Sequence, residues 1–578
     1  MSFNWLNDFS RKLLEAHYVK DGETIDDRFK IACKMYSAGD KHLEHRLYSY
    51  IEKGWFMFAS PVLSNAVKEG EKVKALPISC FVNYVGDSIK GLNEHTVETR
   101  WLAVKGGGVG GHWSDIRSMN DITPGPVGFM HTIDSDMIAY KQGKTRRGSY
   151  AAYLDISHPD IEEFIKMRVP TGDINRKNLN LHHGVNITDE FLVAVDKDLD
   201  WGLLDPHTGD VVSVVKAREL WETILDVRFR TGEPYIHYID EANRRLPQPL
   251  RDKGLKINGS NLCAEISLPT NENRTGVCCL SSVNLAKFDE WKDTTIIEDL
   301  ITMLDNVLQV FIDNAPTELW RATLSAAKER SLGLGAMGFH DYLLSKGIPW
   351  ESPLAIGINR QIFKLIKERA IIASKLLAVQ RGEPEDMEGT LRRNAHLLAI
   401  APNANSSIIL GVSASIEPRL SNAYTQKTRV GSHLVKNPYL DKLIEEKGLD
   451  KDKVWREIIA EEGSIRNLPY FTDQEKELFK TAYEIDQRKV VDMAKSRMEY
   501  ICQSQSVNLF FPSGTDRYYY NKVHLRAFKQ LDDGFLPLKS LYYLRTESGK
   551  KTEQLALKVQ REIVDDGIAG DTCINCEG

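Results

Sequence analysis

The chain has 578 residues and a mass of 65.5 kDa, which is enough for two to four domains or for one large barrel with additions. Hydrophobic residues make up 42% and charged residues 27%, as in globular proteins, and the net charge of −6 gives no basic footprint for nucleic acid. No apolar run approaches the roughly 18 residues of a membrane span, and the first residues lack a signal peptide's apolar core. We therefore predict a cytoplasmic protein with no nucleic-acid or membrane partner.

The first predicted unit is a helical domain over residues 1–59. Between residues 26 and 56, apolar side chains recur at spacings of three and four, which is the period of an amphipathic helix. From residue 60 to about residue 290, short apolar runs alternate with glycine-rich turns and helical segments. That alternation favours an α/β fold with much parallel sheet.

Helical patterns return over residues 293–380, with breaks at SLGLGAMGF and KGIPWESP. Two later segments, HLLAIAPNANSSIILG and SVNLFFPSG, are predicted to be strands, with charged helical material between them. Residues 546–578 are polar and lack aromatic side chains, so we expect a flexible tail there.

The glycine-rich stretch KGGGVGGHW places Gly106, Gly108 and Gly111 in the G-x-G-x-x-G spacing of a dinucleotide-binding loop. That motif follows a strand, whereas the residues before Gly106 are typical of a helix that ends at a glycine. We therefore expect a backbone that passes close to a ligand or to another segment, and a nicotinamide site is the less favoured alternative.

Asn261, Cys263 and Glu265 occupy every second position of NGSNLCAEISLP. If this segment is extended, the three side chains face one side, because side chains alternate along a strand. An amide, a thiol and a carboxylate facing one spot can bind a polyhydroxylated substrate and carry out acid–base and sulfur chemistry. The pattern alone is equally compatible with a surface strand.

The chain has eight cysteines: Cys33, Cys80, Cys263, Cys278, Cys279, Cys502, Cys573 and Cys576. In a reducing compartment, catalytic, transient or metal-binding roles are favoured over permanent disulfides, and some thiols are expected to be buried and inert. Cys278 and Cys279 are neighbours on a predicted strand, so at most one of them can share a site with Cys263. A zinc site with ligands gathered from single cysteines is the main alternative.

Six segments together resemble the large, catalytic subunit of class I ribonucleotide reductase: SNLCAEISLP, GVCCLSSVNL, PISCFVNYVGDS, RSLGLGAMGF, APNANSSI and SLYYLRT. They occur in the order of that family, from about residue 60 to the last residue. The resemblance implies a ten-stranded α/β barrel with a central finger loop over residues 60–545, between the helical domain and the tail at 546–578. It also implies an enzyme that reduces ribonucleoside diphosphates to 2′-deoxyribonucleoside diphosphates, the precursors of DNA, by thiyl-radical chemistry.

The resemblance assigns the radical chemistry to the finger loop. Cys263 is similar to the residue that becomes a thiyl radical and takes the 3′ hydrogen of the ribose. Glu265 resembles the base on the 3′ hydroxyl, and Asn261 resembles the amide that holds the hydroxyls.

Cys80 and Cys278 match the pair that reduces the 2′ position and becomes a disulfide. The alignment of Val277 and Leu280 favours Cys278 over Cys279, which we expect to be a buried thiol. Removal of the 2′ hydroxyl needs two electrons, and a dithiol that becomes a disulfide supplies two.

A substrate-diphosphate pocket is implied by the loop that APNANSSI resembles. Small residues with hydroxyls and exposed backbone N–H groups suit phosphate oxygens, although PNANSS is also a good turn and N-cap sequence. Ser60 in SPVLS and Ser79 beside Cys80 resemble other parts of this pocket. The loop itself contributes Pro402, Asn403, Ala404, Asn405, Ser406 and Ser407.

Asp87 and Ser88 resemble the start of the specificity site, where a deoxynucleoside triphosphate or ATP selects the base that is reduced. Asp87 would contact the sugar of this effector, and Arg117 has the spacing of a triphosphate contact. The segment KQGKTRRGS, with Gln142 and Arg146, resembles the loop between effector and substrate. In the family this site forms at a dimer interface, which implies a homodimer.

Tyr542 and Tyr543 resemble an adjacent pair that passes the radical from a small partner subunit to the cysteine, although a tyrosine pair is more often packing. The relay favours class I over the cobalamin-dependent and glycyl-radical classes. It places the metal-radical cofactor in the partner, and we expect no metal in this chain. Cys573 and Cys576 are then a tail dithiol that carries electrons from thioredoxin or glutaredoxin into the barrel.

Two alternatives belong to other functional classes. A regulatory nucleotide-binding relative without chemistry would not need the complete set of thiols, carboxyl and tyrosines. A generic C-x-x-C oxidoreductase carries its motif at the start of a helix, not on a terminal tail. Many relatives begin with an ATP-binding domain that controls overall activity; here the helical domain starts near residue 1, so we expect specificity control without shutdown by dATP.

Overall fold

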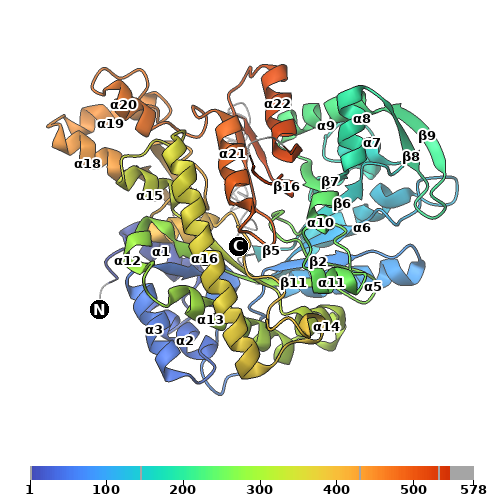
Figure 1. Ribbon diagram of the computed structural model, residues 1–578, viewed down its shortest axis with the longest axis horizontal. Helices are drawn as coiled ribbons and strands as arrows, with labels where there is room; N and C mark the ends of the chain where they lie inside the picture. Colours follow the sequence, from blue (N-terminus) through green and yellow to red (C-terminus); the bar gives the residue numbers. More distant parts are fainter. Residues whose placement is uncertain (1–2, 143–145, 429–430, 531–533, 547–578) are drawn as a thin grey trace, which may run out of the picture.

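The computed structural model describes residues 3–142, 146–428, 431–530 and 534–546. Its centre is an α/β barrel with helices packed around it, and an N-terminal group of helices lies against one side (Figure 1). In the described part of the chain, no helix is both long and apolar enough to cross a bilayer.

The N-terminal helices are α1 (Asp8–His17), α2 (Ile25–Tyr36) and α3 (Lys41–Glu52). The apolar spacing over residues 26–56 predicts the last two, and Phe29 and Leu47 on their inner faces are fully buried. Thr24 begins α2 with a capping box, because its side chain and that of Asp27 each accept a hydrogen bond from the other's backbone N–H.

A nine-stranded sheet follows, with the order β1-β11-β2-β3-β6-β7-β10-β16 and with β12 paired to β11. From β2 to β10 the neighbouring strands are parallel, which confirms the predicted parallel sheet, whereas β11 is antiparallel to β2. The strands are β1 (Phe56–Phe58), β2 (Cys80–Tyr84), β3 (Gly108–His112), β6 (Ser149–Asp155), β7 (His182–Ile187), β10 (Tyr235–Tyr238), β11 (Gly276–Asn284), β12 (Leu332–Met337) and β16 (Ser540–Leu541).

Hydrogen bonds beyond these strands close the sheet into a barrel. Leu334 on β12 pairs with Leu398, and Ile400 pairs in turn with Gln505. Directly after β16, the N–H of Tyr542 donates to the carbonyl of Val507 at 2.9 Å. The eight strands from β12 round to β16 and the two bridged segments account for the ten strands that the resemblance implies.

The helices around the barrel are α5 (Ile89–Val104), α6 (Gly125–Ala139), α9 (Ala217–Thr231), α13 (Ile296–Asn314), α14 (Trp320–Glu329), α16 (Pro353–Arg381), α21 (Gln487–Met498) and α22 (Arg517–Phe528). The long α16 runs diagonally across the view of Figure 1 and packs against α13 and α21. An outer lobe of α18 (Pro438–Glu446), α19 (Lys451–Ala460) and α20 (Asp473–Leu478) has its own small core around Trp455.

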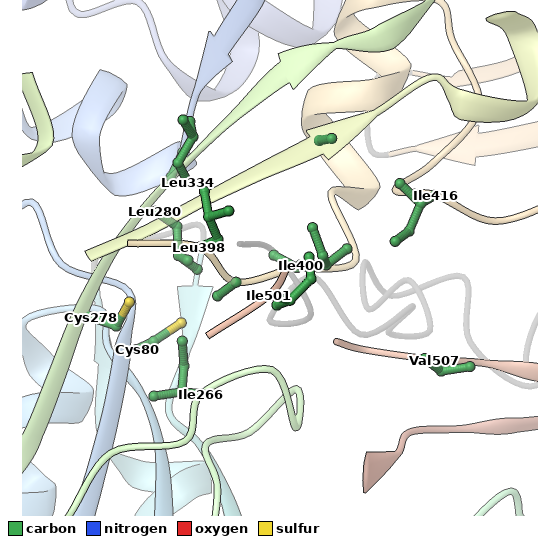
Figure 2. Packing of buried hydrophobic residues seen from close by; sticks show 14 of the residues in the cluster. Cys80, Ile266, Cys278, Leu280, Leu334, Leu398, Ile400, Ile416, Ile501 and Val507 are labelled. Atoms are coloured by element: carbon green, nitrogen blue, oxygen red, sulfur yellow. The ribbon is translucent and has the colours of Figure 1, made fainter. Parts of the chain in front are cut away.

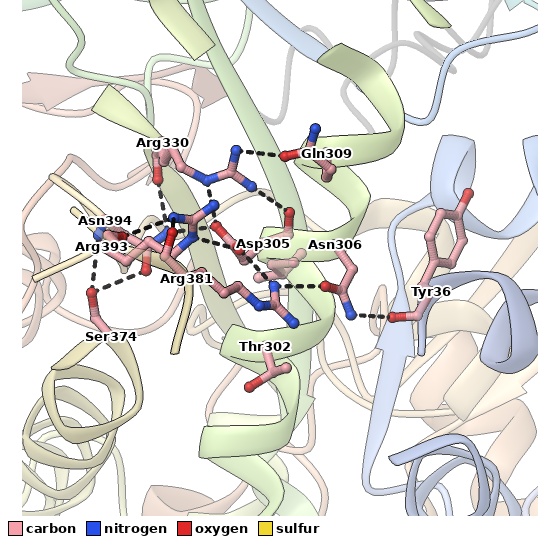
Figure 3. Close-up of polar contacts among 12 residues, drawn as sticks. Tyr36, Thr302, Asp305, Asn306, Gln309, Arg330, Ser374, Arg381, Arg393 and Asn394 are labelled. Carbon is pink, nitrogen blue, oxygen red and sulfur yellow. Dashed lines mark hydrogen bonds and ion pairs between the residues drawn. The ribbon is translucent and has the colours of Figure 1, made fainter. Parts of the chain in front are cut away.

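Two neighbouring residues of α13 join surrounding segments: Asp305 binds three arginines, and Asn306 contacts the N-terminal helices. Asp305 accepts hydrogen bonds from Arg330 Nε at 2.7 Å, Arg381 Nη1 at 2.7 Å and Arg393 Nε at 2.9 Å (Figure 3). Burial opposes ionisation of Asp305, but Arg330 and Arg393 hold its pKa below the ordinary value. The next residue, Asn306, donates to the carbonyl of Tyr36 at 2.8 Å and so joins α13 to α2.

The later elements confirm some predictions and correct one. The break at SLGLGAMGF is the buried strand β12, and SVNLFFPSG contains the strand β15 (Leu509–Phe511), paired with β17 (Leu544–Thr546). The prediction of a strand over all of HLLAIAPNANSSIILG is wrong in its second half. Asn403 there adopts a left-handed φ of 54°, which ends the extended run, and the helix α17 (Ala404–Leu410) follows.

Candidate active site

The segment with Asn261, Cys263 and Glu265 is a buried turn inside the barrel and is not extended, so the condition for strand alternation is not met. Ala264 has a left-handed φ of 61°, and its N–H donates to the carbonyl of Asn261 at 3.3 Å. The Oδ1 atom of Asn261 accepts from the N–H groups of Glu265 at 3.1 Å and Ile266 at 3.2 Å. One amide side chain therefore folds the loop, and this local hydrogen bonding replaces strand alternation as the reason the three residues share a site. We call residues 258–266 the central loop.

The strand β3 passes so close to the central loop that no side chain would fit between them. A Cβ atom on Gly110 would lie 1.8 Å from the carbonyl oxygen of Ser260. On the next strand, β6, the Tyr153 hydroxyl donates to the carbonyl of Asn261 at 2.8 Å. The close approach of Gly110 to Ser260 confirms the prediction that the glycine-rich backbone runs close to another segment. The helix α5 precedes these glycines, which does not fit a dinucleotide-binding loop.

Residues 503–506, which the sequence interpretation missed, hold the central loop from another side. The Ser506 hydroxyl donates to the carbonyl of Cys263 at 2.5 Å, and the N–H of Ser504 donates to the carbonyl of Glu265 at 2.9 Å. All four residues are buried. The only signal in the sequence is their place directly before the strand-like run VNLFF, which starts at Val507.

Cys80 on β2 and Cys278 on β11 lie directly opposite each other in an antiparallel pair. Figure 2 shows both sulfur atoms pointing the same way, close to Ile266 of the central loop. Opposed residues of antiparallel strands have Cα atoms about 4.5–5.5 Å apart, within the range that a disulfide spans. The predicted redox pair therefore has the geometry to form a disulfide without movement of the backbone.

The two thiols of this pair have different polar neighbours. Cys80 Sγ lies 3.5 Å from Glu265 Oε1, and Gln503 Nε2 donates to Cys278 Sγ at 3.2 Å. Burial raises the pKa of Cys278 well above its ordinary value. The thiol of Cys279 instead donates to a backbone carbonyl of α13, as expected for an inert buried cysteine.

Glu265 is a fully buried carboxyl whose acid–base behaviour is shifted towards neutrality. Burial raises its pKa to about 7, although hydrogen bonds from Asn261, Cys80 and Ser506 favour the charged form. A carboxyl that titrates near neutral pH can take up a proton and return it. The Nδ2 atom of Asn261 is buried and has no hydrogen-bond partner among the described residues, so it can donate to a bound molecule.

Tyr542 and Tyr543 form an aromatic chain that reaches the central loop. Tyr542 is buried in one cluster with Cys263, and its ring centroid lies 4.3 Å from that of Tyr543, which is half-buried. A third ring, Tyr235 on β10, lies 4.8 Å from Tyr542 and 5.2 Å from Tyr543. The sequence interpretation missed Tyr235, because nothing in GEPYIHY marks it.

The predicted phosphate loop begins with a residue that shapes it. Asn403 Oδ1 accepts from Ser282 Oγ at 2.9 Å, and Asn403 Nδ2 donates to the carbonyl of Ala336 at 3.1 Å. Because both polar atoms of its side chain are used in this way, Asn403 fixes the turn that starts α17 at Ala404. Its neighbour Pro402 is also buried.

Three elements meet at the Tyr18 hydroxyl. It lies 2.8 Å from Ser60 Oγ, at the start of α4 (Ser60–Asn65), and Asn405 Nδ2 donates to it at 3.3 Å. The structure thus joins two predicted phosphate-pocket residues through a tyrosine that the sequence did not single out. Ser406 and Ser407 are buried in α17.

The predicted effector residues form a separate polar group. Asp87 Oδ2 lies 2.7 Å from Arg117 Nε and 2.6 Å from His207 Nε2, a histidine that the sequence interpretation missed. Ser88 is the N-cap of α5 and accepts a hydrogen bond from the N–H of Gly91 at 2.9 Å. The Asp87 carboxylate therefore already contacts the guanidinium of Arg117 and the imidazole of His207.

Some predicted residues lie outside what the structure describes. Gln142 and Arg146 fall in the short paired strands β4 (Lys141–Gln142) and β5 (Arg146–Arg147), but their side chains are not described. Cys573 and Cys576 lie outside the described residues altogether. Among the residues whose positions are described, no group of three or more His, Cys, Asp or Glu side chains could hold a metal ion. Ser79, which is described, is buried with its hydroxyl 3.4 Å from Cys80 Sγ.

Comparison with known proteins gives one consistent result. The family model "ribonucleotide reductase, all-alpha domain" matches residues 4–71, and "ribonucleotide reductase, barrel domain" matches residues 78–392 and 385–544. A putative ribonucleoside-diphosphate reductase large subunit of Frog virus 3 (isolate Goorha) is 51% identical over 532 residues, which are 92% of each chain. The large subunit of Invertebrate iridescent virus 3 is 41% identical and covers 93% of each chain. Among solved structures, the Actinobacillus ureae class Id ribonucleotide reductase alpha subunit matches with a TM-score of 0.83 and 35% identity, over 94% of this chain and 98% of that one.

Proposed function

The chain belongs to the ribonucleotide reductase large-subunit family and reduces ribonucleoside diphosphates to 2′-deoxyribonucleoside diphosphates, and we propose how its residues divide this reaction. One observation carries the proposal. Cys80 faces Cys278 across an antiparallel strand pair, and Glu265 of the central loop contacts Cys80. The dithiol that can supply two electrons and the carboxyl that can carry a proton therefore lie at the same buried place.

The radical step is assigned to the central loop. A thiyl radical on Cys263 takes the hydrogen atom from C3′ of the ribose, and the carboxylate of Glu265 takes the proton of the 3′ hydroxyl. Asn261 supports this step because its buried Nδ2 is available to donate to a ribose hydroxyl. The pKa of Glu265, about 7, suits a group that must first accept a proton and later return it.

The reductive step is assigned to the dithiol. The C2′–O bond breaks, and the hydroxyl leaves as water with a proton from the pair. Cys80 and Cys278 supply two electrons and one further proton as they become a disulfide, so that a hydrogen replaces the hydroxyl at C2′. Cys263 then returns its hydrogen atom to C3′, and Glu265 returns its proton to the 3′ oxygen. Burial disfavours a free thiolate on Cys278, and the Gln503 amide at 3.2 Å is a donor that can stabilise it while the disulfide forms.

The substrate diphosphate is proposed to bind where α4 and α17 begin. Ser60 and Asn405 approach each other through Tyr18, and backbone N–H groups at the start of a helix favour anions. Asn403 holds this turn in place by its contacts with Ser282 and Ala336.

The partners follow from the same assignment. A small subunit supplies the oxidising equivalent, and Tyr543 and Tyr542 pass it inward to Cys263, with which Tyr542 shares a buried cluster. We propose a homodimer whose specificity site takes a deoxynucleoside triphosphate or ATP at Asp87 and Arg117. Thioredoxin or glutaredoxin would reduce the tail dithiol, Cys573 and Cys576, which then re-reduces the buried pair.

Turnover of CDP with a radical-generating partner subunit and a small dithiol tests the proposal. Cys263→Ser is expected to abolish dCDP formation, whereas Cys279→Ser is expected to retain it. The double variant Cys573→Ser/Cys576→Ser is expected to work with the small dithiol and to fail with thioredoxin. Reduction above background by Cys263→Ser would remove the radical assignment, and thioredoxin-driven turnover by the double variant would remove the tail assignment.

A further inference from the structure

The hydrogen bond between Cys80 and Glu265 has a further use after the ribonucleotide is reduced, when the buried disulfide must be opened again. We propose that Glu265 is the general acid of this step, and that it protonates the Cys80 thiolate that a dithiol reductant releases. The proposal rests on the redox pair of the proposed function, Cys80 and Cys278. It gives Glu265 a second catalytic role, separate from its role as the base on the ribose.

The two sulfur atoms of the pair have neighbours of different chemistry. The Cys80 thiol donates a hydrogen bond to Glu265 Oε1, with 3.5 Å between the sulfur and the oxygen. Gln503 Nε2 donates to Cys278 Sγ at 3.2 Å. An amide can only donate a hydrogen bond to a thiolate, whereas a protonated carboxyl can also give it the proton. The observed contact, a thiol that donates to a carboxyl, is the arrangement that this proton transfer leaves behind.

The surroundings of the carboxyl disfavour two negative charges at once. Glu265 is fully buried, and the titratable side chains that face it are Cys80 on β2, Cys278 on β11, Cys263 on the central loop and Tyr153 on β6. All four are neutral, or negative when they ionise. A Cys80 thiolate beside an ionised Glu265 would place two like charges close together in a buried site, and Coulomb repulsion opposes that state. One proton must therefore remain between the thiol and the carboxyl.

The acidity of Glu265 suits a proton donor at neutral pH. Burial raises its pKa from 4.5 to about 7, although hydrogen bonds favour the charged form. About half of the molecules therefore hold this proton at pH 7, whereas a carboxyl with the ordinary pKa would be almost completely ionised. A thiolate leaves a disulfide faster when its negative charge is stabilised, and a proton donor in contact with the sulfur provides this.

The exchange balances in two steps. A reductant thiolate, whose proton has gone to water, attacks Cys80, which is 4% exposed, whereas Cys278 is fully buried. The Cys80–Cys278 bond breaks, and its electron pair goes to Cys278 Sγ, which takes the proton of the second reductant thiol. The new reductant thiolate then attacks the first reductant sulfur. The bond to Cys80 breaks, its electron pair stays on Cys80 Sγ, and the proton of Glu265 bonds to that sulfur.

The products are a reductant disulfide, two protein thiols and an ionised Glu265. The reductant has lost two electrons, and the pair has gained them. The carboxylate is the form that the radical step uses as a base. It regains a proton from water before the next exchange, which replaces the proton that the first reductant thiol gave to water.

The release of Cys80 can be measured without the radical partner and without CDP. In Cys278→Ser/Cys573→Ser/Cys576→Ser, methyl methanethiosulfonate converts the Cys80 thiol to a methyl disulfide, and dithiothreitol then releases it. Mass spectrometry of the Cys80 peptide follows the reaction. Addition of Glu265→Gln is expected to slow the release at least about tenfold at pH 7.

The pH profile gives a second readout. With the rate divided by the fraction of dithiothreitol present as thiolate, release in the chain that keeps Glu265 should fall about tenfold per pH unit above pH 7. In Glu265→Gln the same quantity should not change with pH, because no group next to Cys80 then loses the proton.

The matched control places the methyl disulfide on the other sulfur. In Cys80→Ser/Cys573→Ser/Cys576→Ser, the released sulfur is that of Cys278, whose side-chain contact is Gln503. Addition of Glu265→Gln is expected to leave this release unchanged at every pH.

Equal release from Cys80 with and without Glu265→Gln would overturn the proposal, as would a profile that does not fall above pH 7. If Glu265→Gln slows release from Cys80 and from Cys278 equally, the cause is a general disturbance of the central loop, which also overturns it. Failure of the premise looks different. Turnover that leaves no Cys80–Cys278 disulfide would remove the redox pair itself, whereas equal release rates leave that pair in place.

Discussion

Cys278 is the register partner of Cys80 across the antiparallel strands β2 and β11, whereas the thiol of Cys279 faces the opposite side and donates to the carbonyl of Leu304 at 3.3 Å. Adjacent residues of a strand face opposite sides, so the doublet presents one sulfur to the central loop and one to α13. The two thiols of the doublet therefore have different surroundings because of strand geometry alone.

This relationship predicts which disulfide forms during turnover. Reduced Cys573→Ser/Cys576→Ser enzyme, which lacks the tail dithiol, is given CDP and its partner but no reductant; it is expected to make about one dCDP per active site and to accumulate a Cys80–Cys278 disulfide. Peptide mapping after alkylation identifies the bridge. Cys278→Ser should form no dCDP, and Cys279→Ser should behave like the unmodified enzyme. A bridge that contains Cys279 would contradict the assignment.

Glu265 is expected to couple activity and stability to pH in opposite directions. Its folded pKa, about 7, lies above its ordinary value of 4.5. The stability that the protonated carboxyl contributes is therefore present below pH 4.5 and is lost as pH rises through 7. Activity, which needs the carboxylate as a base, should rise over the same range.

The matched variant is Glu265→Gln, which cannot ionise. Relative to the unmodified chain, its free energy of unfolding is expected to increase between pH 5 and pH 8 by an amount on the order of 3 kcal/mol, while kcat falls at least about 100-fold. Urea unfolding at the two pH values measures the first effect. If the free energies of unfolding of the variant and the unmodified chain differ by the same amount at pH 5 and at pH 8, Glu265 titrates normally in the folded state.

Much of the barrel could be predicted from the sequence because its signals are local. The apolar spacing over residues 26–56 marks α2 and α3, and short apolar runs between glycines mark the parallel strands. The resemblance also brought Cys80 and Cys278 together, although 197 positions separate them in the chain. Their contact depends on strand pairing, which no local pattern encodes.

The parts that could not be predicted depend on single side chains that override local tendency. Alternation in NGSNLCAEISLP favours a strand, but the Asn261 amide captures two N–H groups and folds a turn. Tyr18 lies far in sequence from Asn405, and no spacing marks it. Such polar contacts across the fold become visible only when the strands and helices are in place.

Gly110 is predicted to be essential because of space and not because of backbone conformation. Gly110→Ala would place a Cβ atom 1.8 Å from the carbonyl of Ser260 and so must displace the central loop. Overpacking of this kind reduces the free energy of unfolding by about 1–3 kcal/mol, and we expect turnover to fall at least tenfold. Gly357→Ala is the matched control, since that glycine lies in α16 with nothing within 4 Å and should gain about 0.5–1 kcal/mol. Normal turnover by Gly110→Ala would show that the loop tolerates displacement.

Tyr18 is predicted to position the diphosphate pocket through its hydroxyl. Tyr18→Phe removes the oxygen that lies between Ser60 and Asn405 but keeps the ring that packs in the N-terminal core. The loss of hydrogen bonds worth about 0.5–1.5 kcal/mol is expected to raise KM for CDP about three- to tenfold, with kcat nearly unchanged. The control is Tyr36→Phe, because the Tyr36 hydroxyl is buried and has no hydrogen-bond partner among the described residues. Removing an unsatisfied buried hydroxyl should leave KM unchanged and leave the free energy of unfolding equal or higher. If both variants raise KM equally, the effect comes from general loosening of the N-terminal helices and not from the contact between Tyr18, Ser60 and Asn405.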